Sequence, residues 1–282
     1  MGLIGKTIQI YMPDGSPTSI KITEITTRIV QLILIPRNKL NEIGQREEVK
    51  NVGVYFLFGK SDTDGKTSVY IGEAENCYER LKQHNRDTNK DFWNVAIVAI
   101  SKTGSFTKAH VKYLESFCYQ EALAIGRYKL ENGNSPTQSS LPEPMIADLM
   151  DNFETIKTLL SALGFPIFEK LVSEESKEIF YCKGKDAIAQ GEYTNEGFVV
   201  LKDSLCNLVE SPTAGSWIEN MRNDLVEKGV LVRQENVLKF TENYIFNSPS
   251  AAAGAVLARR ANGWTEWKDI NGITLDKLKR QG

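Results

Sequence analysis

The first fifty residues alternate apolar and polar positions with a period of two, which is typical of half-buried β-strands. The segments 6–12 (KTIQIYM) and 19–25 (SIKITEI) flank a Pro-Asp-Gly turn, so together they predict a hairpin. A third strand is predicted at 29–36 (IVQLILIP), and a short helix or turn at 37–49. Residues 1–50 are therefore expected to form a β-rich extension that packs on the next domain.

A second hairpin is predicted at residues 53–72 (GVYFLFGKSDTDGKTSVYIG), where two aromatic and β-branched runs flank a polar turn. Each run also carries a glycine and a tyrosine separated by one residue, as Gly53-Val54-Tyr55 and Tyr70-Ile71-Gly72. Glycine weakens a strand and usually marks a bulge or the close approach of another backbone or a ligand. A plain hairpin needs neither glycine, so this pattern calls for another explanation.

The rest of a middle domain, residues 51–140, alternates between helix and strand patterns. Residues 75–85 (ENCYERLKQHN) have helical period, 93–101 (WNVAIVAIS) predict a strand, and Lys108–Ile125 predict a long helix. That long helix has a capping residue before it and a glycine after it, Thr107 and Gly126.

A Pro- and Ser-rich stretch at 131–144 marks a boundary, and the amphipathic helix expected at 145–165 lies in a linking region, residues 141–175. Residues 176–282 predict a C-terminal α+β domain. Its expected elements are strands at 179–183 and 197–204, helices at 216–229 and 248–263, and a hairpin at 230–246. The whole chain is expected to be of the α/β (α+β) class.

Composition and charge limit the classes of function. The chain has 282 residues, of which 41% are hydrophobic and 25% charged, with a formal net charge of −2, so any polyanion must be met by a local patch. The four cysteines lack CxxC spacing and there are two histidines, which argues against a zinc site. There is no signal-peptide pattern, and the longest apolar run is far too short to span a bilayer. A cytoplasmic protein without a membrane partner is expected.

One acidic residue lies where packing alone would not place it. The apolar stripe of the long helix consists of Val111, Leu114, Cys118, Ala122 and Ile125. Glu115 is four residues from Val111 and three from Cys118, so it lies at the edge of that stripe. Burying a carboxylate is costly unless it is paired or holds a metal. Two explanations remain open: an ion pair with a nearby Lys or Arg, or a bound metal ion.

A basic face is predicted on the helix at 75–85. Arg80 and His84 are four residues apart and share one face, whereas Leu81 and Cys77 lie on another. The simple explanation is a solvated basic face that continues through Arg86 and Lys90. The alternative is phosphate binding, because the fixed donors of Arg match phosphate oxygens.

The order of these features resembles the GIY-YIG nuclease family. The first half of its signature is represented by GVY, and the second half, YIG, is intact. The family's active-site positions are matched, in chain order, by Tyr55 and Tyr70 of these two segments and then by Arg80, His84 and Glu115. The resemblance covers roughly residues 51–135.

The resemblance implies a small central sheet flanked by helices, with both tyrosines in one active site beside the Arg and the Glu. Glu115 would bind one Mg²⁺ or Mn²⁺, and Arg80 would stabilise charge on the phosphate. Tyr55 would be the general base, directly or within a proton relay, with His84 as an alternative or assisting base. Tyr70 would orient water or phosphate.

The family also has an asparagine after the Glu helix, and two residues of this chain fit that place. Asn134 is preferred and Asn132 is the alternative. For either residue, a turn-forming role in the loop would also explain its presence.

The C-terminal segment looks like a prokaryotic domain of unknown function that is often attached to GIY-YIG nucleases. Cations and aromatic residues occur together in it: Arg259, Arg260, Trp264, Trp267 and Lys268. Such a group suits a nucleic-acid strand or a flipped base. The alternative is that both tryptophans close a small core while the arginines are solvated.

Together these features predict a divalent-metal-dependent DNA endonuclease with a C-terminal targeting domain, acting in restriction, defence or repair. Arg86 and Lys90 would add contacts to DNA, and residues 1–50 either pack on the sheet or touch DNA. The near-neutral net charge predicts a modest affinity for DNA that falls as the salt concentration rises. A homodimer or a protein partner would then supply the additional affinity. The rival functions are an inert nucleic-acid-binding adaptor and an RNase that uses the same site.

Overall fold

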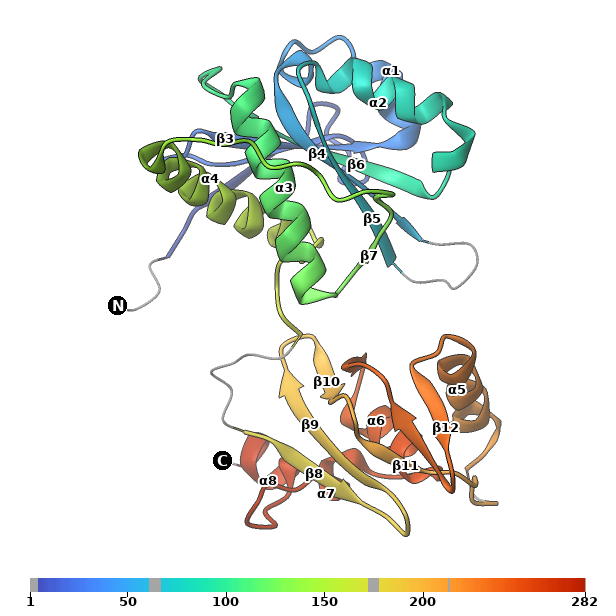
Figure 1. Ribbon diagram of the computed structural model, residues 1–282. Coiled ribbons are helices and arrows are strands. Elements are labelled where there is room, and N and C mark those ends of the chain that lie inside the picture. The colour runs from blue at the N-terminus through green and yellow to red at the C-terminus, as the bar shows by residue number, and fades with distance from the viewer. Residues whose placement is uncertain (1–4, 61–66, 172–177, 213, 282) are drawn as a thin grey trace. The chain divides into compact units, whose positions relative to one another are not determined.

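The computed structural model describes residues 5–60, 67–171, 178–212 and 214–281, and it divides the chain into two units, Met1–Glu169 and Lys170–Gly282 (Figure 1). Each unit has its own sheet and its own helices, so the coarse expectation of a mixed α/β chain is confirmed. No helix within the described parts is long and apolar enough to cross a membrane.

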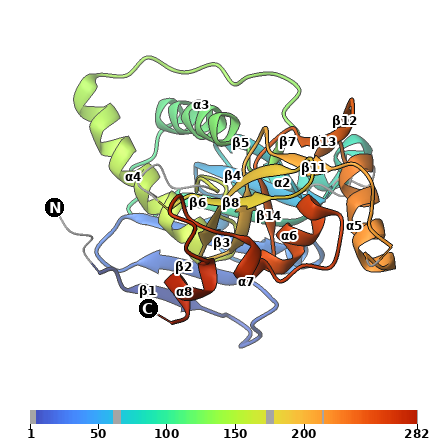
Figure 2. The ribbon, with the colours of Figure 1, turned by 90° about the horizontal axis from the view of Figure 1, so that it is seen from below.

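The first unit is built on a seven-stranded sheet. In spatial order its strands are β1 (Ile8–Tyr11), β2 (Lys21–Ile25), β3 (Val30–Pro36), β6 (Trp93–Ser101), β4 (Gly53–Lys60), β5 (Thr67–Ala74) and β7 (Lys129–Leu130). Neighbouring strands are antiparallel, except for the short parallel pairing of β5 with β7. Figure 2 shows β2, β3, β6, β4 and β5 following one another across the sheet.

The N-terminal strands belong to this sheet, which corrects the expectation that residues 1–50 form a separate extension. β3 pairs with β6 over its whole length, from Val30 opposite Ser101 to Pro36 opposite Val95. The alternating pattern correctly predicted strands here. It does not show that β3 pairs with β6, because the paired residues lie between 59 and 71 positions apart in the chain.

Helices cover both faces of the sheet. One face carries α1 (Leu40–Ile43) and α2 (Cys77–Arg86), and the other carries α3 (Lys108–Ile125) and α4 (Glu143–Ala162). Short 3-10 turns lie at Arg37–Lys39, Glu48–Lys50 and Thr88–Lys90. Because both faces are covered, β4 is buried from Gly53 to Gly59, with Tyr55 and Leu57 on the α2 side and Val54, Phe56 and Phe58 on the α3 side.

The helix expected to link two domains instead packs within the first unit. Leu149, Phe153 and Ile156 of α4 are buried in the same core as Val111 and Leu114 of α3. An amphipathic pattern shows that a helix has a face to bury but does not identify the surface that buries it. The division between the units falls after residue 169, inside the expected linking region 141–175 but after its helix, which belongs to the first unit.

The second unit has a sheet in the order β12-β13-β11-β9-β10-β14, with β8 paired to β9. Its strands are β8 (Phe180–Lys183), β9 (Ile188–Thr194), β10 (Gly197–Val200), β11 (Leu205–Asn207), β12 (Leu231–Gln234), β13 (Val237–Phe240) and β14 (Tyr244–Phe246). Its helices are α5 (Ser216–Glu227), α6 (Pro249–Leu257), α7 (Gly263–Glu266) and α8 (Leu275–Lys279). The alanine-rich helix α6 is buried along most of its length, because small side chains let it approach the sheet closely.

Candidate active site

Three polar side chains meet on the α2 side of the first sheet. The hydroxyl of Tyr55 lies 2.8 Å from Nε2 of His84, and Nε of Arg80 donates to the same hydroxyl at 3.3 Å. Tyr55 and His84 are 1% and 3% exposed, whereas Arg80 is half-buried. The structure thus brings together a phenol, an imidazole and a guanidinium that the sequence places up to 29 residues apart.

Helix α2 positions two of these groups. It begins after Asn76, whose side chain accepts the backbone N–H of Glu79, and Cys77 and Leu81 anchor it in the core. With that anchor, the four-residue spacing turns both Arg80 and His84 toward Tyr55. The explanation of a solvated basic face therefore fails for these two residues.

Two further residues were expected on that basic face, and the structure separates them. Nζ of Lys90 lies 3.7 Å from the ring centroid of Tyr70, so Lys90 is next to the site. Arg86 is exposed at the end of α2, and none of the described contacts ties it to the site. Lys90 is therefore the better placed of the two to meet a ligand there.

The two tyrosines of the hairpin stack against each other, and both rings pack at a tilt against the histidine. The ring centroids of Tyr55 and Tyr70 are 6.2 Å apart, and each ring lies 5.2–5.3 Å from that of His84. Tyr70 is half-buried, so it is more accessible than Tyr55. The accessible side of the cluster is therefore the side of Tyr70 and Arg80.

The glycines of the hairpin have two different roles. Gly72 lies directly across from Tyr55, and a Cβ at position 72 would overlap the Tyr55 hydroxyl. Gly53 lies against the neighbouring strand β6, where a Cβ would press on the carbonyl oxygen of Ala99. The first glycine therefore makes room for a site residue and the second for strand pairing.

Backbone groups along the outer edge of β5 are met by side chains rather than by a full strand. Asn132 accepts the N–H of Ile71 at 3.1 Å and donates to its carbonyl at 2.8 Å. Two residues further on, the backbone of Glu73 lies against the Glu115 carboxylate. Alternate residues of an edge strand direct their N–H and C=O groups outward, so both side chains lie at the same open edge.

This geometry selects between the two asparagines. Asn132 bridges the strand that carries YIG, whereas Asn134, the residue preferred from the sequence, is exposed in the following loop. Asn132 is therefore the better placed of the two, and a role of either residue in the reaction stays a prediction. A spacing pattern in a loop cannot distinguish two asparagines two residues apart.

Glu115 is half-buried and lies in an acidic environment. Burial first, and then the neighbouring Glu73 carboxylate, raise the pKa of Glu115 to about 7, although Lys108 and Lys112 oppose the shift. Lys108 forms its ion pair with Glu73 instead, at 3.0 Å. The described contacts therefore do not show an ion pair of Glu115 with a lysine, which was one of the two explanations left open by the sequence.

The donor set suits a small, hard cation held mainly by water and substrate. No group of three or more His, Cys, Asp or Glu residues that could bind a metal occurs in the described part of the chain. Mg²⁺ commonly binds through one or two carboxylates together with substrate phosphates and water. Glu115, with Glu73 beside it, fits that mode of binding and does not fit a zinc site with four protein ligands.

Burial controls the protonation of Tyr55 and His84. It raises the pKa of Tyr55 far above its ordinary value, although Arg80 opposes the shift, so the phenol keeps its proton. Burial, followed by the cations Lys90 and Arg80, lowers the pKa of His84 to about 3, so the imidazole is neutral at pH 7. Arg80 donates to the Tyr55 oxygen, and the tautomer of the neutral imidazole that is protonated at Nδ1 can accept the Tyr55 proton at Nε2.

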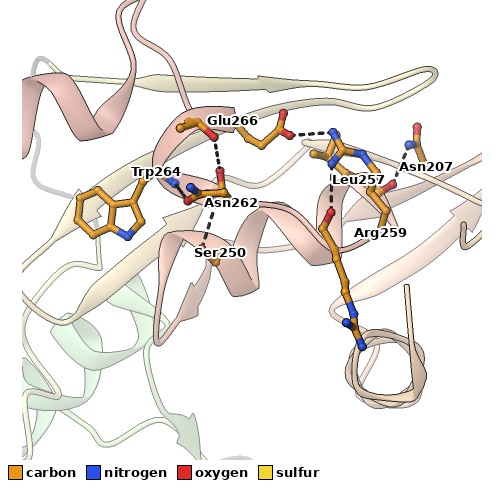
Figure 3. Close-up of polar contacts among 10 residues, drawn as sticks. Asn207, Ser250, Leu257, Arg259, Asn262, Trp264 and Glu266 are labelled. Carbon is orange, nitrogen blue, oxygen red and sulfur yellow. Dashed lines mark hydrogen bonds and ion pairs between the residues drawn. The ribbon is translucent and has the colours of Figure 1, made fainter. Parts of the chain in front are cut away.

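In the second unit, the structure does not gather the expected cations around both tryptophans. Trp267 is fully buried; its Nε1 donates to the carbonyl of Pro249 at 3.0 Å, and its ring lies 4.3 Å from that of Phe198. The expectation that Trp267 contacts nucleic acid is therefore wrong, because its ring fills the core. Arg259 is ion-paired with Glu266 at 2.8 Å (Figure 3).

The remaining members of the group are more accessible. Arg260 and Lys268 are exposed, and Trp264 is partly buried against Tyr193. The cation over the Trp264 ring is Arg280, whose guanidinium lies 3.5 Å from the ring centroid. No local pattern could have identified Arg280, because it is sixteen residues away on another helix end.

Two sequence motifs of the second unit make the contacts between α6 and α7. Oγ of Ser250 accepts the backbone N–H of Gly263 at 3.0 Å, and the Asn262 side chain accepts the N–H of Trp264 (Figure 3). A Cβ at position 263 would overlap the carbonyl of Pro249. The Ser-Pro-Ser and Asn-Gly-Trp segments thus hold α6 and α7 together.

Comparison with known proteins concerns this second unit. Residues 180–279 match a family described as "Domain of unknown function (DUF4357)". No curated protein and no solved structure matched the chain. The C-terminal unit is therefore similar to a family without an assigned activity, and the GIY-YIG resemblance of residues 51–135 stays a prediction.

Proposed function

We propose that the first unit is a divalent-metal-dependent endonuclease of the GIY-YIG type and that the second unit targets it to DNA. The observation that carries the proposal is the contact of Tyr55 with both His84 and Arg80. A merely structural tyrosine does not need an imidazole and a guanidinium on one buried hydroxyl. Glu115 at the adjacent edge of β5 completes the set of groups that phosphodiester hydrolysis requires.

Hydrolysis needs a base that removes a proton from the attacking water. In the proposed reaction, the Tyr55 oxygen takes the water proton while its own proton passes to Nε2 of His84. The low pKa of His84 comes from burial and from the cations Lys90 and Arg80. A bound phosphodiester would offset both cations and raise the basicity of the imidazole when substrate is present.

Charge on the phosphate is met by cations on the accessible side of the cluster. Arg80 donates through Nε to Tyr55 and through Nη1 to Gln83, and its remaining N–H groups can bind a non-bridging phosphate oxygen. Lys90 over the Tyr70 ring is placed to bind the same phosphate or the next one. Tyr70 then orients the water or the phosphate through its hydroxyl.

Glu115 would hold one Mg²⁺ or Mn²⁺ ion, which would supply positive charge to the scissile phosphate and to the leaving oxygen. Asn132 keeps the edge of β5 in place, and so keeps the Glu73 backbone aligned with the Glu115 carboxylate.

The decisive experiment compares wild-type protein with Glu115→Ala and Tyr55→Phe on plasmid, single-stranded DNA and RNA, with Mg²⁺ or Mn²⁺. Glu121→Ala, on the same helix, is the matched control. Cleavage by wild type and the control, but not by the two site variants, with DNA binding retained in all four, supports the nuclease. Binding by wild type without cleavage of any substrate would favour the adaptor, and cleavage of RNA alone would favour the RNase.

A further inference from the structure

A lysine next to the proposed metal site is held in place by two acidic residues. Nζ of Lys108 lies 3.0 Å from the Glu73 carboxylate and 3.8 Å from that of Glu75. Glu73 is also the residue whose backbone lies against the Glu115 carboxylate. The ammonium group and the proposed metal ligand are therefore tied to one residue of β5.

The position of Lys108 in its helix is unfavourable for helix stability. It is the first residue of α3, where the helix dipole disfavours a cation, and the first turn contains no acidic residue that would offset it. The Lys108 side chain is 43% exposed, whereas that of Glu73 is 12% exposed. The pair therefore has one anchored partner and one accessible partner.

We infer that Lys108 is a substrate-binding residue, whose ammonium group contacts a non-bridging oxygen of the scissile phosphodiester, and that Glu73 is the residue that positions it. An ammonium group has three donors; one is hydrogen-bonded to Glu73, and Glu75 lies beyond hydrogen-bond distance, so donors remain for the phosphate. Arg80 meets the phosphate from the α2 side of β5 and Lys108 from the α3 side. This inference rests on the proposed nuclease function.

A matched control exists elsewhere in the same unit. Lys102 pairs with Glu24 at 3.1 Å, so Lys102→Gln also breaks one lysine–glutamate pair but lies away from the proposed site. Single-turnover cleavage of a DNA duplex that wild type cuts, in Mg²⁺, would be measured for both variants. DNA affinity would be measured without metal, in EDTA, as a function of salt.

We expect Lys108→Gln to lower the single-turnover rate constant by about 10²-fold and to reduce the slope of log affinity against log salt by about one. Lys102→Gln should match wild type in both measurements. Lys108→Gln behaving like Lys102→Gln would show that the pair is only structural and would overturn the inference. If wild type cuts nothing, the proposed function fails, and the salt slope in EDTA alone decides whether Lys108 meets phosphate.

Discussion

The phenol ring of Tyr55 lies over Gly72 of the adjacent strand, directly opposite it in the β4–β5 register. No other residue type leaves room there, because a Cβ at position 72 would overlap the Tyr55 hydroxyl. Gly72 thus fixes where the hydroxyl meets His84 and Arg80.

The substitution Gly72→Ala is accordingly expected to displace Tyr55. We expect the unit to lose about 1–3 kcal/mol of stability through overpacking, and cleavage to fall by more than the stability loss explains. The measurements are urea unfolding and single-turnover cleavage. Gly133→Ala is the control, since nothing lies within 4 Å of a Cβ at that position. Cleavage by Gly72→Ala at the wild-type rate would mean that the position of the Tyr55 hydroxyl is not important for cleavage.

The two asparagines after α3 give a matched pair of variants. Asn132→Ala leaves the N–H and C=O of Ile71 without their present partners at the edge of β5. We expect a loss of about 1–3 kcal/mol, together with faster amide exchange around residues 71–73. Asn134→Ala should be silent in hydrogen-exchange mass spectrometry and in unfolding. Equal effects of the two variants would contradict the assignment.

The parts of the fold that local patterns determine were predictable from the sequence. The helix Lys108–Ile125 begins and ends where the period, the Thr107 cap and Gly126 place it, and Gly126 has the left-handed conformation expected after a helix. These signals act within a few residues of one another. The side of α2 that carries Arg80 and His84 follows from helical spacing for the same reason.

The remaining features depend on contacts between distant segments. Pairing of β3 with β6 and docking of α4 bring together residues far apart in the chain, and an alternating or amphipathic pattern does not specify such partners. Burial of Trp267 is likewise decided by Phe198, sixty-nine residues away. Trp264 and Trp267 look alike in the sequence, yet only the second lies in the core.

Titration of Glu115 gives a prediction with a defined sign. Its pKa rises from 4.5 to about 7, first because of burial and then because of Glu73. Between those values the folded protein keeps a proton that the unfolded chain has lost, so the stability contributed by this group falls as pH rises. Without metal at pH 8, Glu115→Gln should therefore be more stable than wild type. Each pKa unit corresponds to about 1.4 kcal/mol, and partial exposure reduces the gain to about 1–2 kcal/mol.

The same variant separates the metal site from folding. Adding Mn²⁺ should raise the unfolding temperature of wild type, because a ligand that binds only the folded state stabilises it. Glu115→Gln should gain nothing, and it should have lost its stability advantage at pH 4, where the wild-type carboxyl is protonated. An equal Mn²⁺ effect on both proteins would place the metal elsewhere.

In the second unit, a core substitution should lower stability, whereas substitution of two surface cations should leave stability nearly unchanged. Trp267→Ala removes a ring that packs on Phe198 and donates to Pro249, and we expect a loss of about 3–5 kcal/mol, seen as lost amide protection in α6. The double variant Arg260→Gln, Lys268→Gln changes two exposed cations. It should leave stability within about 0.5 kcal/mol.

If the second unit targets DNA through that surface, the double variant should lower the salt slope of DNA binding by about two. The control is a second double variant at exposed cations of the same unit, Lys185→Gln with Arg233→Gln, which should retain the wild-type slope. Equal slopes for both double variants and wild type would show that neither pair of cations contacts DNA. At saturating DNA the single-turnover cleavage rate should not change in either double variant, because the proposed catalytic residues all lie in the first unit.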